Sequence, residues 1–504
     1  MGQQLSMKEK VFAFSTMGIG FFIALLDIQI VSASLRDIGG GLSAGADETA
    51  WVQTSYLIAE IVVIPLSGWL SRVLSTRWLF AISSIGFTLA SLACGWAWNI
   101  ESMIVFRALQ GFLGGSMIPT VFTTAFFYFQ GQQRVIAAAV LGAISSLAPT
   151  LGPTVGGWLT DHYSWHWLFF VNLVPGVFVS IVVPALVKID KPNLSLLKSG
   201  DYPGIILMAL FLGCLEYVLE DGQRWDWLED PDIRLAAIVS GVSGVLFLWR
   251  SLTYAHPVVD FSALLNRNFG LGSLFSFITG VGVFSTIYLT PVFLGRVRGF
   301  SALQIGEAVF STGLFQICAI PVYTFLARRV DLRWLMMVGL AGFGLSMLSF
   351  QPITHDWGWK ELLLPQAFRG FSQQFAVAPT VTLALGALAP ERLKLASGLF
   401  NVMRNLGGAI GIAVCGTILN NRTNQHFLHL AEHLNSANPA VPAAALEGKV
   451  QPLKLLWSLT FREAQTQSFA DAFFVIMLCF VVATLMVPLL KKAGAPPAPS
   501  ADAH

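Results

Sequence analysis

Three charged side chains interrupt apolar stretches of this chain and have the types needed for proton chemistry. Asp27 and Glu60 are carboxylic acids, and Arg107 is a permanent cation. Charged groups are costly in an apolar environment, so such residues are functional candidates. Burial favours the neutral form of an acid, whereas a neighbouring guanidinium favours its charged form. An acid that moves relative to an arginine would therefore take up and release a proton. The pattern predicts proton coupling by Asp27, Arg107 and Glu60.

Other ionisable residues lie in apolar runs, and their roles are open at this stage. Arg369 and Arg404 would either face a central cavity or extend their guanidinium groups to the inner surface. Glu216 is expected at an outer edge or an interface. The five cysteines are dispersed, and their spacing indicates neither a metal site nor a redox pair.

The composition indicates that membrane-spanning helices position these residues. The 504 residues are 55% hydrophobic and only 12% charged, whereas soluble chains carry about 25% charged residues. A spanning helix needs about 20 mainly apolar residues, and the chain has fourteen such runs. We therefore predict an all-α membrane protein with 14 transmembrane helices. The runs lie near residues 12–35, 50–70, 78–98, 102–127, 135–159, 165–187, 203–221, 233–252, 268–295, 303–326, 334–351, 361–388, 394–419 and 466–490.

Charge gives the expected orientation. Lys8 and Lys10 precede the first run, and most of the 30 lysine and arginine residues fall in the segments that are then inside. The prediction is an integral protein of the cell (inner) membrane with both termini in the cytoplasm. The basic residues form no patch, so no nucleic-acid partner is expected.

An internal repeat divides the chain. Leu70–Leu79 recurs as Leu326–Leu335, and Arg107 recurs as Arg369. We predict two six-helix parallel repeats with two inserted helices between them, an arrangement typical of transporters. The predicted domains are an N-terminal half (1–190), the insert (200–255), a C-terminal half (262–490) with an outer loop (420–465), and a disordered cytoplasmic tail (491–504).

The outer loop contains three histidines at helical spacing, His426, His429 and His433. Two such residues with a further ligand could bind zinc. The surrounding sequence is simply amphipathic, which favours a partner-docking or lid helix. No bound metal is predicted.

One apolar run is rich in residues that disrupt helices. Within residues 135–159 the chain places two prolines and three glycines close together. We predict a bent helix, thinned by glycine for close packing at a moving seam against the opposite half. The residues of this motif are Pro149, Gly152, Pro153, Gly156 and Gly157.

Five segments match family motifs. Leu26–Val31 resembles a first-helix LDxTIV motif, and Arg107–Gly111 resembles RxxQG. Gly152–Gly157 matches GPxxGG, and Trp165–Gly176 resembles WRWxFxINxPxG. Gly68–Arg72 resembles the loop motif GxLaDrxGrk, with Arg72 in place of the usual Asp. The chain thus resembles the major facilitator superfamily over nearly its whole length, specifically its fourteen-helix drug:proton antiporters.

The resemblance implies a proton-coupled antiporter that exports amphipathic or hydrophobic drugs or toxic compounds by alternating access. An alternative is an exporter dedicated to one metabolite, such as a siderophore or an organic acid. Neither is an enzyme, and the proton gradient replaces any cofactor. The implied partners are a small-molecule substrate, protons, a periplasmic adaptor and an outer-membrane channel. Gly68, Arg72 and Arg77 would form a gating loop.

Depth in the predicted helices suggests residues of a substrate cavity, although aromatic residues in membranes mostly serve packing. The candidates are Gln53, Tyr56, Phe126, Phe284 and Phe315.

Overall fold

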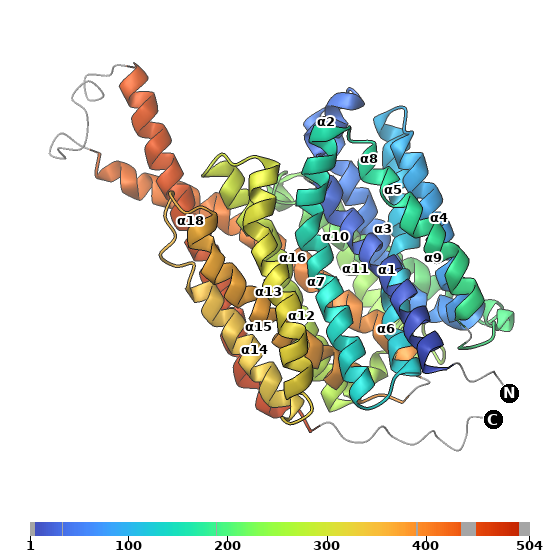
Figure 1. Cartoon of the computed structure of the whole chain (residues 1–504). Coiled ribbons are helices and arrows are strands. Elements are labelled where there is room, and N and C mark those ends of the chain that lie inside the picture. Colours follow the sequence, from blue (N-terminus) through green and yellow to red (C-terminus); the bar gives the residue numbers. More distant parts are fainter. Residues whose placement is uncertain (1–5, 33, 188, 390–391, 435–449, 493–504) are drawn as a thin grey trace.

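The computed structural model describes residues 6–32, 34–187, 189–389, 392–434 and 450–492. Long helices run side by side through the molecule (Figure 1), and the described residues contain no strand. We call the end of the molecule where α1 begins and α18 ends the base; it lies at the bottom of Figure 1.

The helices fall into three successive sets. The first set is α1 (Met7–Ser32), α2 (Leu35–Gly41), α3 (Ala46–Leu74), α4 (Thr76–Gly95), α5 (Ile100–Gly115), α6 (Met117–Tyr128), α7 (Gln132–His162), α8 (Trp167–Phe170) and α9 (Leu173–Leu186). The second is η1 (Leu194–Leu197), α10 (Tyr202–Asp221), η2 (Trp227–Glu229), α11 (Pro231–Thr253) and η3 (Phe261–Leu265). The third is α12 (Arg267–Arg296), α13 (Ala302–Leu326), α14 (Leu332–Leu348), α15 (Trp359–Leu385), α16 (Leu393–Glu432), α18 (Val450–Met486) and η5 (Val487–Leu489).

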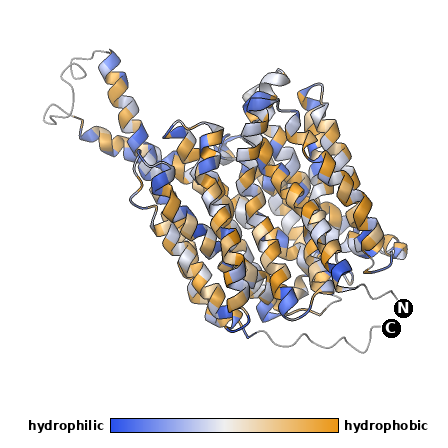
Figure 2. Ribbon diagram, viewed as in Figure 1, coloured by the Kyte–Doolittle hydropathy of each residue, from blue (hydrophilic) through white to orange (hydrophobic). Residues whose placement is uncertain are grey.

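Among the described residues, 12 helices are long and apolar enough to cross a membrane, where α5 with α6 and α8 with α9 each count as one span. Two further helices occupy predicted spans: α14 is a shorter apolar helix, and α15 is a longer helix with more polar residues. The chain is therefore an integral membrane protein. The number of fourteen spans and the internal repeat remain predictions. Figure 2 shows that hydrophobic residues predominate along the helices.

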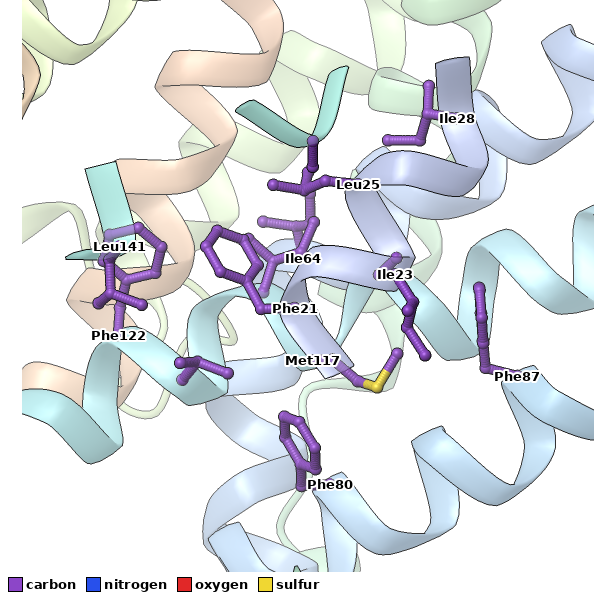
Figure 3. Packing of buried hydrophobic residues seen from close by; sticks show 14 of the residues in the cluster. Phe21, Ile23, Leu25, Ile28, Ile64, Phe80, Phe87, Met117, Phe122 and Leu141 are labelled. Atoms are coloured by element: carbon purple, nitrogen blue, oxygen red, sulfur yellow. The ribbon is translucent and has the colours of Figure 1, made fainter. Parts of the chain in front are cut away.

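Two hydrophobic clusters hold the helices together. Figure 3 shows part of the first, where Phe21 of α1 lies near Phe122 of α6 and Ile64 of α3. This cluster also takes in the base ends of α15 and α16, whereas the second cluster joins α12 to α18 with the start of α7. The first and third sets of helices are therefore packed against each other at the base.

The inserted helix α10 packs along α3. Gly213 lies against Ile58, and the rings of Tyr217 and Trp51 stack with centroids 5.2 Å apart. Gln223, just after α10, donates from Nε2 to the carbonyl oxygen of Gly416 in α16 at 2.6 Å. The insert therefore touches both the first and the third set of helices.

Much of the predicted outer segment 420–465 is helical, as expected around the three histidines. Residues up to Glu432 continue α16, and α18 begins at Val450. The two extensions pack through Phe427 and Trp457, with ring centroids 6.1 Å apart. Amphipathic spacing lets each helix continue beyond its apolar part, and the extensions project at the upper left of Figure 1. Residues 435–449 between them, and residues 493–504 of the predicted tail, lie outside the described residues.

Candidate functional site

A buried ion pair lies between α1 and α5. Nη1 of Arg107 donates to Oδ2 of Asp27 at 2.5 Å, and both side chains are fully buried. Taking two charges out of water is costly, and the cost is offset only when the pair is close and further hydrogen-bonded. The sequence had singled out both residues, and the fold brings them into direct contact.

Three polar side chains complete this network. Gln110 donates from Nε2 to Oδ1 of Asp27 at 3.0 Å and accepts from Arg107 Nη1 at 2.8 Å. Asn172 donates from Nδ2 to the same Asp27 oxygen at 2.5 Å. Both amides also donate to the hydroxyl of Ser91, at 3.1 and 3.0 Å. Asp27 is therefore held by donors from α5 and from the loop before α9.

The guanidinium of Arg107 is also fixed from α3. Its Nε donates to the carbonyl oxygen of Val52 at 3.0 Å, and the central guanidinium carbon, Cζ, lies 4.2 Å from the centre of the Tyr56 ring. The Tyr56 hydroxyl in turn donates to the carbonyl oxygen of Ala24 in α1 at 3.2 Å. Any shift of α1 relative to α3 and α5 thus changes the distance between Asp27 and its counter-ion.

Glycines of α7 position α1 beside this network. A Cβ atom on Gly152 would lie 2.5 Å from Cβ of Gln29, and one on Gly156 would meet the carbonyl oxygen of Ile30. The helix is continuous through Pro149 and Pro153. Gly152 and Gly156 thus lie against α1 and not against the opposite half as expected. The helix α7 itself does pack against α13 and α15 of the third set. The other side of α7 meets α13, where Thr154 lies against Gly306.

Glu60 and Arg404 face each other across the α3–α16 contact. Glu60 is 2% exposed, and its Oε1 has no hydrogen-bond partner among the described residues. Arg404 donates from Nη1 to the Ser145 hydroxyl at 2.8 Å. The two charges attract each other without forming a direct ion pair. Arg404 is buried, so it does not extend to the surface.

A second ion pair lies at the base, where it joins the segment after α9 to the start of α16 beside the end of α3. Asp190 pairs with Lys394 and accepts from the backbone N–H of Thr76 at 3.0 Å. Lys394 also donates to the carbonyl oxygen of Ser71 at 3.1 Å. Arg72 is exposed on the neighbouring turn. A carboxylate thus lies beside the predicted gating loop even though position 72 is an arginine, because Asp190 from a later segment accepts a hydrogen bond from Thr76.

Close backbone contact accompanies this ion pair. A Cβ atom on Gly68 would lie 2.8 Å from the Lys394 carbonyl oxygen, and Thr123 shares a 2.7 Å hydrogen bond with Ser397. Arg77 of the predicted gating loop lies over the Trp78 ring at 5.1 Å. Of the three predicted loop residues, Gly68 alone forms part of this contact between α3 and α16.

Replacing Asp190 with asparagine should open the base. A hydrogen bond to a charged group contributes about 1.5–3 kcal/mol, so we expect a roughly tenfold or larger shift toward the open population. Spin labels at Trp78 and Trp334, both exposed near the base, would report the change as a longer distance in pulsed electron resonance. The charge-swapped variant Asp190→Lys/Lys394→Asp should restore the short distance. An unchanged distance in Asp190→Asn would show that the pair does not hold the base closed.

The predicted substrate-cavity residues make contacts in different places. Gln53 donates to Glu220 of α10 at 3.3 Å, and Tyr56 belongs to the Arg107 site. Phe126 lies under Arg134, with the guanidinium 5.0 Å from the ring centre. Phe284 faces Gly408, and Phe315 is 38% exposed. These contacts do not define a common cavity.

The remaining ionisable candidates are also placed. Arg369 is 2% exposed inside the α13–α15 contact, so it does not reach the inner surface. Glu216 is 5% exposed, on the face of α10 that carries Gly213 against α3, which is an interface position. Nε2 of His426 lies 2.8 Å from Asp471 Oδ2, and the described residues include no group of three or more metal-ligating side chains.

Several residues of these sites had no predicted role, among them Gln110, Asn172, Ser91 and Asp190. Gln110 and Asn172 lie within the motifs that carry the family resemblance, so their positions in those motifs could have identified them as site residues. Ser91 is one serine among many in apolar helices. Asp190 is an acid in a basic segment, and nothing in the sequence links it to Lys394. The partners of a buried charge depend on helices that are distant in the chain.

Buried charges at the contacts between membrane helices are typical of membrane transporters. The comparisons agree with this class. A family model described as Major Facilitator Superfamily matches residues 17–412, and the chain belongs to that family.

Its relatives include transporters named EmrB. The chain is 42% identical to the colistin resistance protein EmrB of Acinetobacter baumannii, covering 84% of this chain and 83% of the relative. It is 30% identical to the multidrug export protein EmrB of Escherichia coli strain K12, covering 86% and 85%. The proton:xylose symporter XylE shares the fold, with a TM-score of 0.62 at 11% identity over 97% of both chains.

Proposed function

We propose that this protein is a proton-coupled antiporter that exports amphipathic or hydrophobic compounds from the cytoplasm or the inner leaflet by alternating access. The observation that carries the proposal is the fully buried pair of Asp27 and Arg107. An ionisable pair inside a membrane protein is costly, and proton relays are a common reason for its presence.

The pair can link helix movement to proton transfer. While Arg107 is within hydrogen-bond distance, its positive charge favours ionised Asp27. When α1 moves away from α5, the carboxylate loses this cation in an apolar environment, and it takes a proton from the outer water. Return of Arg107 favours the ionised form again, and the proton leaves toward the cytoplasm. Each cycle would thus move a proton inward while substrate moves outward.

Glu60 is proposed as a second charged group of this machinery. It lies on α3 and attracts Arg404 on α16, so separation of these helices would leave a buried carboxylate available to a cationic substrate or a proton. The names of the relatives, colistin resistance and multidrug export, favour a broad exporter of toxic compounds over one dedicated to a siderophore or an organic acid.

Transport by the reconstituted protein tests the proposal. Proteoliposomes with an imposed pH gradient should accumulate ethidium, a lipophilic cation, and collapse of the gradient with nigericin should stop the uptake. Uptake that continues unchanged would show that protons do not drive transport. A panel of dyes, antibiotics and organic acids separates a broad exporter from a dedicated one. Glu60→Gln should reduce cation transport more than transport of neutral compounds.

The helical extensions of α16 and α18 are proposed to dock a periplasmic adaptor that leads to an outer-membrane channel. They project from the bundle and expose apolar side chains, including Leu428, Leu455 and Trp457. Exposed apolar groups of this kind commonly mark protein contacts. Copurification of the adaptor with the wild type, and its loss on Trp457→Ser, would support this role; full export by the protein alone would argue against it.

A further inference from the structure

We propose that Arg369 and Gln366 bind the carboxylate of an amphipathic organic anion at the contact between α13 and α15. The role of such a ligand as a substrate rests on the proposed export function, whereas its binding does not. The two residues lie one turn apart on α15 and are 2% and 0% exposed.

The guanidinium of Arg369 has donors to spare. Its Nη2 donates to the Thr312 hydroxyl of α13 at 2.9 Å. Its Nε and Nη1 are buried and have no hydrogen-bond partner among the described residues. Arg369 also forms no ion pair with any described carboxylate. A buried arginine without a counter-ion is costly, and an anionic ligand would remove that cost.

Arg107 and Arg369 differ in whether the protein supplies a counter-ion. Both arginines are fully buried at corresponding positions of the two predicted repeats. Arg107 has Asp27 as its counter-ion and Gln110 as an acceptor. Arg369 has only the hydroxyl of Thr312. Nη2 of Arg107 also has no partner among the described residues, so the two sites differ in their counter-ion: Arg107 has a carboxylate within the protein, and Arg369 has none.

The neighbouring side chains also favour an anion. Thr312 donates to Oε1 of Gln366 at 2.7 Å, which leaves Nε2 of Gln366 as a buried donor without a partner in the described chain. Thr312 thus links the two side chains into one hydrogen-bonded unit. Three nitrogen donors of this unit have no partner among the described residues, namely Nε and Nη1 of Arg369 and Nε2 of Gln366. A carboxylate accepts from a planar guanidinium through two parallel hydrogen bonds and has further acceptor sites for the amide.

The surroundings determine what kind of anion fits. Leu362 and Phe375, about two turns from Arg369 on either side along α15, belong to the second hydrophobic cluster. The helix that carries the site is therefore mainly apolar, which favours a ligand with an apolar body over a small inorganic ion. Two glutamines join this region to α7: Gln374 donates to the Ala139 carbonyl oxygen at 3.0 Å, and Gln316 donates to that of Gly142 at 3.4 Å. Separation of α7 from α13 and α15 during alternating access would open the site.

Binding of a matched pair of ligands tests the proposal. Naphthalene-1-acetate and its neutral isostere naphthalene-1-acetamide should be titrated calorimetrically into the purified full chain in a neutral detergent. We expect wild type to bind the acetate about 10- to 100-fold more tightly, as a charge-assisted hydrogen bond predicts. Arg369→Gln should reduce acetate binding to the level of the amide and leave amide binding unchanged. Arg369→Lys should retain part of the preference.

A surface variant and a milder variant serve as controls. Arg333→Gln removes an arginine that pairs with Asp331 near the surface, and it should keep the full preference for acetate. Gln366→Leu removes one donor without removing charge and should weaken acetate binding severalfold, so the proposal stays testable even if Arg369→Gln does not fold.

Three results would overturn the proposal: equal affinity of wild type for both ligands, equal loss of both in Arg369→Gln, or displacement of acetate by phosphatidylglycerol. The second would indicate a structural role, and the third a lipid head group. These titrations use no proton gradient, so their outcome does not depend on whether transport is coupled to protons. Equally, a failure to bind the acetate would not contradict proton-coupled export.

Discussion

Asp27→Asn should abolish gradient-driven export while the protein remains folded. Asparagine keeps the shape of the side chain but cannot exchange a proton near neutral pH. It retains an oxygen that can accept from Gln110 and Asn172, which donate to Asp27 in the wild type at 3.0 and 2.5 Å. Uptake in proteoliposomes under an imposed pH gradient should fall to the level of empty vesicles, whereas the elution profile should remain that of a folded protein.

Stability measurements separate coupling from folding in this variant. Loss of one partner of a buried ion pair costs about 3–5 kcal/mol, and Arg107 has no second carboxylate in contact among the described residues. The double variant Asp27→Asn/Arg107→Gln should recover thermal stability and remain inactive. Asp27→Glu keeps a titratable group and should retain partial coupling. Normal gradient-driven uptake by Asp27→Asn would place the proton site elsewhere.

Gly156→Leu is expected to have the second large effect. Its new Cβ would meet the Ile30 carbonyl oxygen, so α1 must move away from α7. Overpacking of this kind costs about 1–3 kcal/mol, and the displaced α1 carries Asp27 away from Arg107. We expect a lower unfolding temperature together with loss of export, because both depend on the position of α1.

A second glycine provides a matched control for that substitution. Gly241 lies within the membrane helix α11, and a Cβ atom there would have no neighbour within 4 Å. Gly241→Leu should therefore leave both stability and export near wild type. If Gly156→Leu behaved like Gly241→Leu, α1 would not depend on close packing against α7.

The candidate charges were predictable because hydropathy is a local property. Asp27, Glu60 and Arg107 each stand out against apolar neighbours, and the fold places all three in buried positions. The Pro149–Gly157 segment was correctly expected to allow close helix contact, and α7 does pack against α13 and α15, but the neighbour of Gly152 and Gly156 is α1. Composition shows that a helix is thin without showing which neighbour approaches it, and here the neighbour is α1.

Hydropathy did not show, for a related reason, that the membrane helices continue into the predicted outer segment. Residues near His426 are too polar to read as a membrane span, so the apolar run ended before the helix did. The helix continues to Glu432 because its amphipathic face packs on the extension of α18, through Phe427 and Trp457. A pairing partner that lies beyond residues 435–449 could not be inferred from hydropathy alone.

The sequence by itself determined the membrane class, most of the helices, the family and the buried charges, because each depends on residues close together in the chain. Only the tertiary structure decided how those charges are compensated. It pairs Asp27 with Arg107 and Asp190 with Lys394, and it leaves Arg369 without a carboxylate among the described residues. Electrostatic energy depends on the distances between charges in space, and helix packing brings together residues that are far apart in the chain.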